Sequence, residues 1–566
     1  MQPRVAWLGV SSLWLHRLRW IAIGWTVVFW RLGYLSLLDP DEAHYAELTR
    51  EMLRSNSWLV PLLDGVPFID KPVFFHWLQG SAVWLLGESE FAVRLPTALA
   101  AIGLFAVTRR LGLVLFEEEI GEWGAIMFAT IPATFALSSV ALFDMVFTAF
   151  LFGAVACLLI ASAQRSRRVE YAGYALLTLA TMTKGPVAPV LVGLFIGFGY
   201  TLGPHARERL ARLHWIRGLA AALLAASPWF IWMSFHFGDR FLNDYLLAGN
   251  VWYFTQPTRF SSRAIDHAFY ARTFVGGFFP WTIVMIGRGI DAMRRRAVGR
   301  GFSLDEQLLW LWTAVVIGFF TLARFKLDHY IFPAAPACCL LAARAWRDAV
   351  DCPREQTRAT RIAIFGIGAV MVVSGAFLSV FQFDLDLELP AASILLPAAL
   401  AVGGILLLAR GTLDRWTPPV TAAIPVATLL AVYAIVVTIG FPTLERVRPI
   451  SSVGIRLHNN VPADGVVGLY RLERWRASLR YYVDRPVERV ETPEDVRAIV
   501  ARDVPVYIVM LRREYDALRH DGVPLHQVFR RRCVIGTTGT GIRRQQWGYL
   551  VVASNRRPRL PWTPDQ

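Results

Sequence analysis

Lysine is rare in this chain, and its positions are the first candidates for chemistry. Of the 58 basic residues 55 are arginine, and lysine occurs only at Lys71, Lys184 and Lys326. A compact ammonium suits tight phosphate sites that a planar guanidinium does not fit. Chance placement is the alternative for so few residues. The three lysines are therefore candidate phosphate ligands.

A cluster of acids follows the first apolar stretch, in the sequence DPDEAHYAE at positions 39–47. The proline ends the preceding helix, and Asp39 or Asp41 is a suitable N-cap for an interfacial helix over residues 42–54. Capping accounts for one acid, but not for a third acid and a histidine at a membrane–water boundary. We therefore expect Asp41 to act in catalysis, with capping as the alternative.

Four ionisable groups stand at or near predicted membrane boundaries. Asp70 and Lys71 are adjacent, and as an exposed pair they would contribute less than about 1 kcal/mol. Asp144 lies among apolar residues, where an acid is costly unless it is paired or faces a cavity. Lys184 precedes a Gly-Pro break between two apolar segments, which leaves its ammonium facing the outer side. A functional role is expected for these groups; for Asp144, an acid at a helix end is the alternative.

The elements that must position these residues are apolar segments long enough to cross a membrane. The chain is 55% hydrophobic with a mean hydropathy of +0.42, and several runs approach the ~20 residues needed for a transmembrane helix. About thirteen spans are predicted, centred on residues 20–38, 91–115, 120–137, 139–162, 170–183, 185–202, 215–235, 271–289, 306–323, 328–346, 361–381, 390–409 and 419–440.

The connections between these segments alternate in charge. Every second connection is rich in arginine, as at residues 165–168, 205–217, 294–300 and 344–361, and this set is predicted to be cytoplasmic. The lysines and the acids fall in the other set, which includes a first outer loop at 39–90 and a long outer loop at 234–270. The net charge of +15 is thus explained by membrane topology rather than by nucleic-acid binding. The five cysteines show no disulfide or metal spacing.

The tail differs in character from the rest. Residues 441–566 are polar, with short β-like runs near 466–470, 506–510 and 549–552 and helical stretches between them. We expect a mainly α fold: a membrane domain over residues 1–440 and a soluble α/β domain over 441–566. With thirteen spans, this tail lies on the same outer face as the lysines.

Five motifs in order resemble a known family. They are Asp-Glu-x-x-Tyr-Ala-Glu at 41–47, Asp-Lys-Pro at 70–72, the acid at 144, Thr-Lys-Gly at 183–185 and Lys-Leu-x-x-Tyr-Ile at 326–331. This order resembles the GT-C membrane glycosyltransferases that use polyprenyl-phosphate sugars. The branch that it resembles most is that of the bacterial aminoarabinose lipid A transferases, with the protein O-mannosyltransferases more distant. His44 and Phe68 depart from the aminoarabinose pattern, which leaves the sugar and the acceptor open.

The resemblance implies roles for individual residues. Asp41 and Asp144 correspond to catalytic acids in one cavity. The substrate-binding residues would be Lys71, Lys184, Lys326, Tyr330, Glu42, His44 and Tyr45. The sequence itself establishes no cofactor, but the resemblance implies a divalent cation near Asp70 and His267, which correspond to the family's residues beside a bound metal.

The function expected from this resemblance is transfer of a sugar from a polyprenyl-phosphate donor to an envelope acceptor, such as a lipid A-like lipid or another glycoconjugate. The reaction would be an inverting hexosyl or pentosyl transfer, in a multi-pass inner (plasma) membrane protein whose active site is extracytoplasmic. The partners would be the donor, the acceptor and membrane lipids, with no nucleic acid. A protein O-mannosyltransferase-like enzyme and a lipid-linked sugar flippase are the alternatives.

Overall fold

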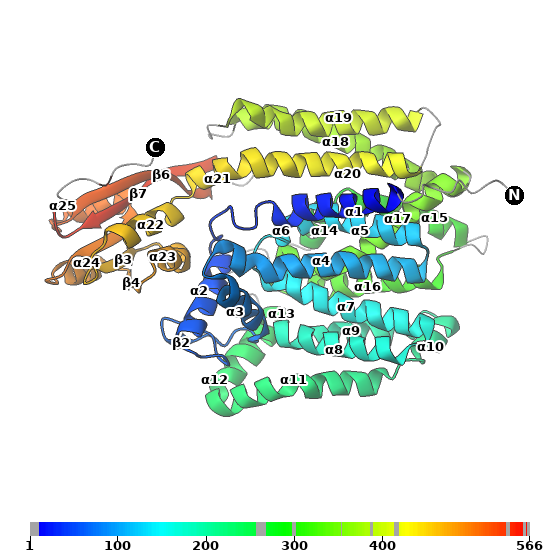
Figure 1. The fold of residues 1–566 in the computed structure, drawn as a ribbon, viewed down its shortest axis with the longest axis horizontal. Helices are drawn as coiled ribbons and strands as arrows, with labels where there is room; N and C mark the ends of the chain where they lie inside the picture. The colour runs from blue at the N-terminus through cyan, green and yellow to red at the C-terminus, as the bar shows by residue number, and fades with distance from the viewer. Residues whose placement is uncertain are drawn as a thin grey trace.

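The structure, a computed structural model, is mainly helical, with long helices side by side and a β-sheet unit at one end (Figure 1). It describes residues 11–255, 268–296, 301–352, 354–384, 389–412, 418–538, 544–557 and 562. Of the predicted site residues, His267 lies outside these ranges.

Each of the thirteen apolar segments contains a helix. The helices are α1 (Ser11–Gly24) with its continuation η1 (Trp25–Phe29), α4 (Glu90–Leu115), α5 (Glu118–Thr130) with α6 (Pro132–Leu137), α7 (Phe143–Gln164), α8 (Arg167–Lys184), α9 (Val187–Gly199), α11 (Trp215–Phe237), α14 (Phe269–Gly277) with α15 (Trp281–Arg296), α16 (Leu304–Leu322), α17 (Ala335–Asp351), α18 (Arg358–Asp384), α19 (Leu395–Thr412) and α20 (Pro418–Ile435) with η6 (Val436–Gly440).

Six of these helical stretches, among the described residues, are long and apolar enough to cross a membrane: Glu90–Leu115, Phe143–Gln164, Trp215–Phe237, Arg358–Phe381, Ala391–Ala409 and Thr421–Val447. A seventh span results if α14 and α15, between which the helix axis bends by 109°, are counted together. Apolar side chains on α18 remain exposed, including Val373 and Val380 at 66% and 69%. A surface of this kind suits lipid rather than water, and the chain is a multi-pass membrane protein.

Proline accounts for several of the shorter helices. Pro132 starts α6 directly after α5, Pro186 precedes α9, and Pro280 stands at the bend between α14 and α15. Proline lacks the amide hydrogen that would continue the preceding helix, so a new helix begins at or just after each of these prolines. The count of thirteen spans stays a prediction.

The short elements cluster at the two ends of the helices. At the end that carries the sheet lie α2 (Asp41–Arg54), the hairpin β1 (Leu62–Leu63) and β2 (Val66–Pro67), α3 (Phe74–Leu86), α12 (Asp239–Phe241), η2 (Leu242–Trp252) and α13 (Tyr253–Thr255) (Figure 1). At the opposite end lie α10 (Pro204–Leu210) and the N-terminal start of α1 (Figure 1). The turn η3 (Asp328–Ala334) leads into α17.

The unit after the last long helix is a five-stranded mixed sheet with helices on both faces. It follows α21 (Phe441–Val447) and contains α22 (Ile450–Asn460), β3 (Val466–Tyr470), α23 (Arg476–Val483), β4 (Val487–Val490), α24 (Pro493–Val500), β5 (Val506–Leu511), α25 (Arg512–His520), β6 (His526–Thr538) and β7 (Arg544–Ser554). The strand order is β4-β3-β5-β7-β6; β3 is parallel to β4 and β5, and β7 is antiparallel to β5 and β6. One apolar core lies towards α22 and α23, and a second towards α24 and α25.

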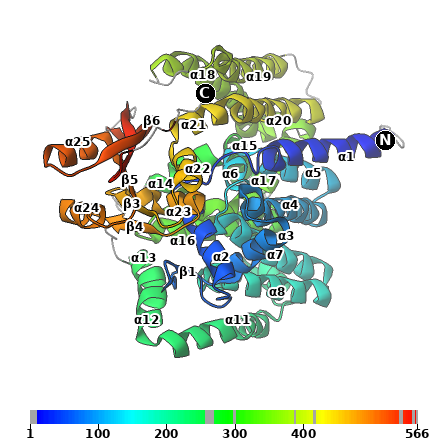
Figure 2. The ribbon, with the colours of Figure 1, turned by 60° about the vertical axis from the view of Figure 1, so that its left-hand side comes forward.

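Helix α23 joins the sheet unit to the membrane helices by packing beside α2 (Figure 2). Arg480 donates to Glu47 at 2.7 Å and to Glu51 at 2.9 Å, both on α2. Arg50 of α2 donates back to the carbonyl of Tyr481 at 2.8 Å. Because Glu47 and Arg50 are buried, these contacts hold α2 in one orientation against the sheet unit.

Candidate active site

Seven of the predicted site residues line one cavity of about 520 Å³ at the sheet end of the helices. They come from α2, the loop before α3, the start of α7, the end of α8 and the turn η3. The seven are Asp41, Tyr45, Asp70, Lys71, Asp144, Lys184 and Tyr330. The fold therefore brings together side chains that lie almost 300 positions apart in the sequence.

Asp144 and Lys184 form an ion pair at the centre of this set. Asp144 lies in the first turn of α7, and Lys184 is the last residue of α8. The positive end of a helix dipole favours the carboxylate and the negative end favours the ammonium, so the two helix ends match the two charges. His329 lies 3.3 Å from the second carboxylate oxygen of Asp144. The ring of Tyr330 is 4.5 Å from the Lys184 ammonium.

The break after Lys184 needs glycine. Gly185 has a φ of +85°, a conformation that side chains with a Cβ rarely adopt. A Cβ at this position would also lie 2.1 Å from the Tyr245 hydroxyl. The glycine thus ends α8 immediately after the lysine and lets η2 close over the same side of the cavity.

Lys71 reaches the cavity from the loop that follows the β1–β2 hairpin. The hairpin turns at Asp64 and Gly65, whose φ values are +55° and +73°, as a tight Asp-Gly turn requires. The Lys71 ammonium contacts the carboxylate of Asp70 at 3.0 Å. Both lysines of the cavity are thus paired with an adjacent or facing aspartate, and each ammonium retains donors for a further acceptor.

Asp41 is the exposed acid of the cavity. It is the first residue of α2, and the N-cap is Pro40, without a side-chain hydrogen bond, so neither Asp39 nor Asp41 has the capping role considered from the sequence. Tyr45, one turn later, packs edge-on against Phe143 with ring centroids 4.7 Å apart. The helical spacing of four residues places Asp41 and Tyr45 on the same face.

His44 does not line the cavity. Its ring packs against Phe68 at 5.2 Å and against Tyr45 at 5.9 Å. Burial lowers the pKa of His44, although the Asp41 and Asp70 carboxylates oppose this shift. The histidine therefore supports the positions of the aromatic residues beside the cavity.

Glu42 is turned away from the cavity into a buried ion pair. Its carboxylate accepts from Arg94 at 2.7 and 2.9 Å and from the backbone amides of Leu38 and Ala141, both at 2.8 Å. Arg94 also donates to three backbone carbonyls between residues 32 and 36. These contacts join the segment between η1 and α2, α2 itself, α4 and the segment before α7, so the Glu42 carboxylate serves to hold the fold together.

Lys326 also points away from the cavity lining. Its ammonium donates to the carbonyls of Phe320, Thr321 and Ala323 at the end of α16. A cation at this position satisfies carbonyls that have no partner within the helix. In the predicted 326–330 segment, Tyr330 faces the cavity and Lys326 stabilises the turn that presents it.

The metal site predicted at Asp70 and His267 is not tested by the described residues. Asp70 lies at the cavity and is paired with Lys71, while His267 lies outside the described residues. No group of three or more His, Cys, Asp or Glu side chains in the described ranges could hold a metal ion. A divalent cation near Asp70 and His267 therefore stays a prediction.

Sequence reasoning missed two kinds of residue. His329 lies inside the Lys-Leu-x-x-Tyr-Ile motif, so its position was within reach of motif analysis. The second kind is an apolar wall of the cavity, formed by Phe254, Phe319 and Phe325. Motif analysis could not group these three residues, because they come from separate segments. Aromatic side chains and paired charges in one cavity suit a phosphate ester with an apolar tail.

Comparisons with known proteins agree with this description. Residues 70–232, which include Lys71, Asp144 and Lys184, match the family described as Dolichyl-phosphate-mannose-protein mannosyltransferase. The chain is 28% identical over 354 residues to the undecaprenyl phosphate-alpha-4-amino-4-deoxy-L-arabinose arabinosyl transferase 1 of Sodalis glossinidius, covering 58% of this chain and 59% of that protein. It is 29% identical over 383 residues to the corresponding transferase of Aeromonas salmonicida, covering 62% and 65%. The chain thus aligns with about three-fifths of the length of these curated relatives.

Solved structures extend the likeness to the whole fold. ArnT from Cupriavidus metallidurans, bound to undecaprenyl phosphate, has a TM-score of 0.73 at 19% identity, covering 99% of this chain and 100% of that one. The Archaeoglobus fulgidus oligosaccharyltransferase has a TM-score of 0.52 at 11% identity, covering 91% and 71%. The chain is thus similar in sequence to the aminoarabinose transferases and, over residues 70–232, to the protein mannosyltransferases, and it shares the fold of ArnT, which confirms the resemblance in its motifs.

Proposed function

We propose that this protein transfers a sugar from a polyprenyl-phosphate donor to a lipid A-like lipid or another envelope glycoconjugate. The observation that carries the proposal is the single cavity that holds Asp41, Lys71, the Asp144–Lys184 pair and an apolar wall. The named relatives, which are undecaprenyl phosphate-aminoarabinose transferases, support the donor class.

The lysines hold the donor phosphate. Lys71 and Lys184 each have ammonium donors beyond those used by their aspartates, and a phosphate oxygen accepts from both. Asp144 holds Lys184 at the end of α8, with His329 on its other side. As the bond between the anomeric carbon and the phosphate oxygen breaks, the electron pair leaves with the phosphate, and the two cations stabilise this charge.

Asp41 acts on the acceptor. An acceptor hydroxyl attacks the anomeric carbon, and its proton moves to the Asp41 carboxylate as the new carbon–oxygen bond forms. If the acceptor is itself a phosphate, no proton is removed, and Asp41 orients the acceptor. One displacement of either kind inverts the anomeric centre. Tyr45 and Tyr330 enclose the reacting groups and limit access of water.

The membrane topology belongs to this proposal. We infer thirteen spans in the inner membrane, with the cavity and the α/β unit over residues 441–566 on the extracytoplasmic side. The cavity residues and the sheet unit lie at one end of the helices, whereas α10, in an arginine-rich connection, lies at the other (Figure 1). The positive connections favour the cytoplasm. Labelling of cysteines introduced at Asn250 and Gln566 with an impermeant reagent tests this orientation; protection of both sites would contradict it.

Reconstitution tests the activity. The purified protein in vesicles is incubated with undecaprenyl phosphate-aminoarabinose and lipid A, and separately with a polyprenyl-phosphate mannose donor and an acceptor peptide, and the products are analysed by mass spectrometry. The match over residues 70–232 makes the second pair the alternative. Glycosylated lipid supports the proposal, and glycosylated peptide supports the mannosyltransferase alternative. Movement of the donor across the vesicle without any product would support a transporter instead.

A further inference from the structure

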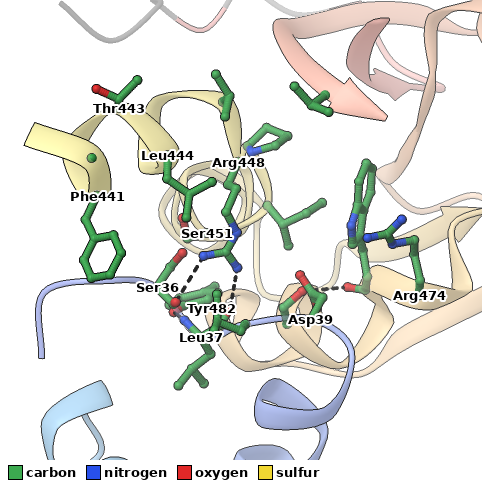
Figure 3. Close-up of a pocket in the computed structure, with 18 of the residues that line it drawn as sticks. Ser36, Leu37, Asp39, Phe441, Thr443, Leu444, Arg448, Ser451, Arg474 and Tyr482 are labelled. Carbon is green, nitrogen blue, oxygen red and sulfur yellow. Dashed lines mark hydrogen bonds between the residues drawn. The ribbon is translucent and has the colours of Figure 1, made fainter. Parts of the chain in front are cut away.

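A second cavity, of about 500 Å³, lies where the last long helix meets the sheet unit (Figure 3). It is enclosed by η6 and α21, by α22 and α23, and by the segment before α2. It shares no lining residue with the cavity described above. The proposed transfer chemistry therefore leaves this cavity without a role.

The lining of the second cavity has two chemically different sides. Val436, Phe441 and Leu444 provide an apolar side, which belongs to the last part of the membrane stretch Thr421–Val447. Arg448 and Arg474 stand on the side of the sheet unit (Figure 3). An apolar side at the end of a membrane helix and a cationic side beyond it match an amphiphile with an anionic headgroup.

The two arginines differ in what they can offer a ligand. Arg448 donates to the carbonyls of Ser36 at 3.3 Å and Leu37 at 2.6 Å, which holds the segment before α2 in place. Arg474 is exposed and forms no ion pair with the residues that the structure describes; its guanidinium lies 5.7 Å from the ring centroid of Trp475. The N–H donors of its guanidinium are thus available to a planar or tetrahedral anion such as a phosphate.

Asp39 adds a hydrogen-bond acceptor to the same cavity. Its Oδ1 atom is buried and has no hydrogen-bond partner among the described residues. Burial raises the pKa of this carboxyl to about 6, against a hydrogen bond from Ser478 and the charges of Arg448 and Arg474. A ligand that satisfies both groups carries an anion for Arg474 and a hydroxyl or amine for Asp39, as a phosphorylated sugar does.

The two cavities meet at one turn of the chain. Asp39 lines the second cavity and Asp41 lines the first, and Pro40 alone separates them. A headgroup bound at Asp39 and Arg474 therefore lies beside the turn that presents Asp41. We propose that the second cavity binds the acceptor, a phosphorylated glycolipid, and directs its headgroup towards Asp41. This inference rests on the proposed sugar transfer.

Photocrosslinking identifies the occupant directly. A photoreactive amino acid replaces Leu444 in the cavity or, as a control, Val380 on the exposed face of α18, and the crosslinked lipids are analysed by mass spectrometry. The membranes contain phosphatidylglycerol, phosphatidylethanolamine and bisphosphorylated lipid A. We expect enrichment of lipid A at position 444 and the bulk lipid mixture at position 380. Arg474→Glu should abolish the enrichment, and Arg497→Glu, which alters an exposed arginine paired with Glu494, should preserve it.

The outcomes separate the possible sources of the phosphate. Enrichment of phosphatidylglycerol that lipid A does not displace would mean a structural lipid and would overturn the assignment to the acceptor. The same mixture at both positions, or enrichment that survives Arg474→Glu, would overturn the phosphate site itself. Because crosslinking does not depend on turnover, a wild-type protein that binds lipid A here but makes no product would refute the proposed transfer and leave the binding site standing.

Kinetics add a second readout. Arg474→Glu should raise the KM for lipid A by about 10- to 100-fold, the effect expected from loss of a hydrogen bond to a charged group. The KM for the donor should stay within a factor of two or so, because Lys71 and Lys184 are untouched. Arg474→Lys should retain part of the affinity. A loss of kcat with both KM values unchanged would contradict an acceptor site.

Discussion

Replacement of Glu42 by glutamine tests whether this residue binds substrate or belongs to a structural ion pair. The sequence predicts that Glu42 contacts substrate, because it follows Asp41 in the motif. In the structure its carboxylate is buried, accepts two hydrogen bonds from Arg94 and two from backbone amides, and does not line the cavity. Glu42→Gln keeps the shape of the side chain but removes the charge that Arg94 needs.

The expected magnitude follows from the burial of both partners. The Arg94 and Glu42 side chains are 2% and 0% exposed. Removal of one partner of such a pair leaves an uncompensated buried charge and costs about 3–5 kcal/mol in stability. The matched control is Glu88→Gln, which alters the exposed Arg54–Glu88 pair and should cost at most about 1 kcal/mol.

The assay has two readouts from the same preparations. Thermal unfolding of the purified variants is followed by tryptophan fluorescence, and sugar transfer per folded molecule is measured well below the unfolding temperature. We expect a clear drop in the unfolding temperature for Glu42→Gln, little change for Glu88→Gln, and near-normal turnover of the folded fraction. An unchanged unfolding temperature together with lost turnover would show that Glu42 acts on substrate and would refute the structural assignment.

Four further predictions concern the two cavities. Asp41→Asn should fold normally and bind the donor, while turnover falls by a factor on the order of 10²–10⁴; normal turnover would contradict its role as base. Lys184→Arg should impair transfer although it keeps the charge, because a wider planar head does not fit beside Asp144; the donor KM measures this. Gly185→Ala should reduce donor binding and stability, since the positive φ and the nearby hydroxyl of Tyr245 exclude a Cβ, whereas Gly193→Ala, with open space around it, should be tolerated. Burial raises the pKa of Asp39 from 3.8 to about 6, so the folded protein retains a proton that the unfolded chain loses. Stability should therefore fall as pH rises from about 4 to 6, and Asp39→Asn should remove this slope in unfolding temperature against pH.

The sequence alone determined the helical segments and the principal charged groups of the cavity. Apolar runs and the prolines that interrupt them are local features, and each apolar segment predicted from them contains a helix. Asp144 was predicted because an acid among apolar residues is costly without a partner or a cavity. Lys71 and Lys184 were predicted because lysine is rare in this chain, and Asp41 because capping accounts for only one acid of its cluster. Residue type and local context were sufficient for these four.

Only the tertiary structure decided which neighbouring residue faces the cavity and which holds the fold together. Asp41 and Glu42 are adjacent acids in one motif, but successive residues of a helix point about 100° apart, so one lines the cavity and the other meets Arg94 on α4. Lys326 resembles the other lysines in sequence, yet the end of α16 supplies three carbonyls for its ammonium. The second cavity depends on the docking of α23 and α21 against the turn at Asp39. These outcomes are set by contacts between segments tens to hundreds of residues apart, which no local pattern of residues specifies.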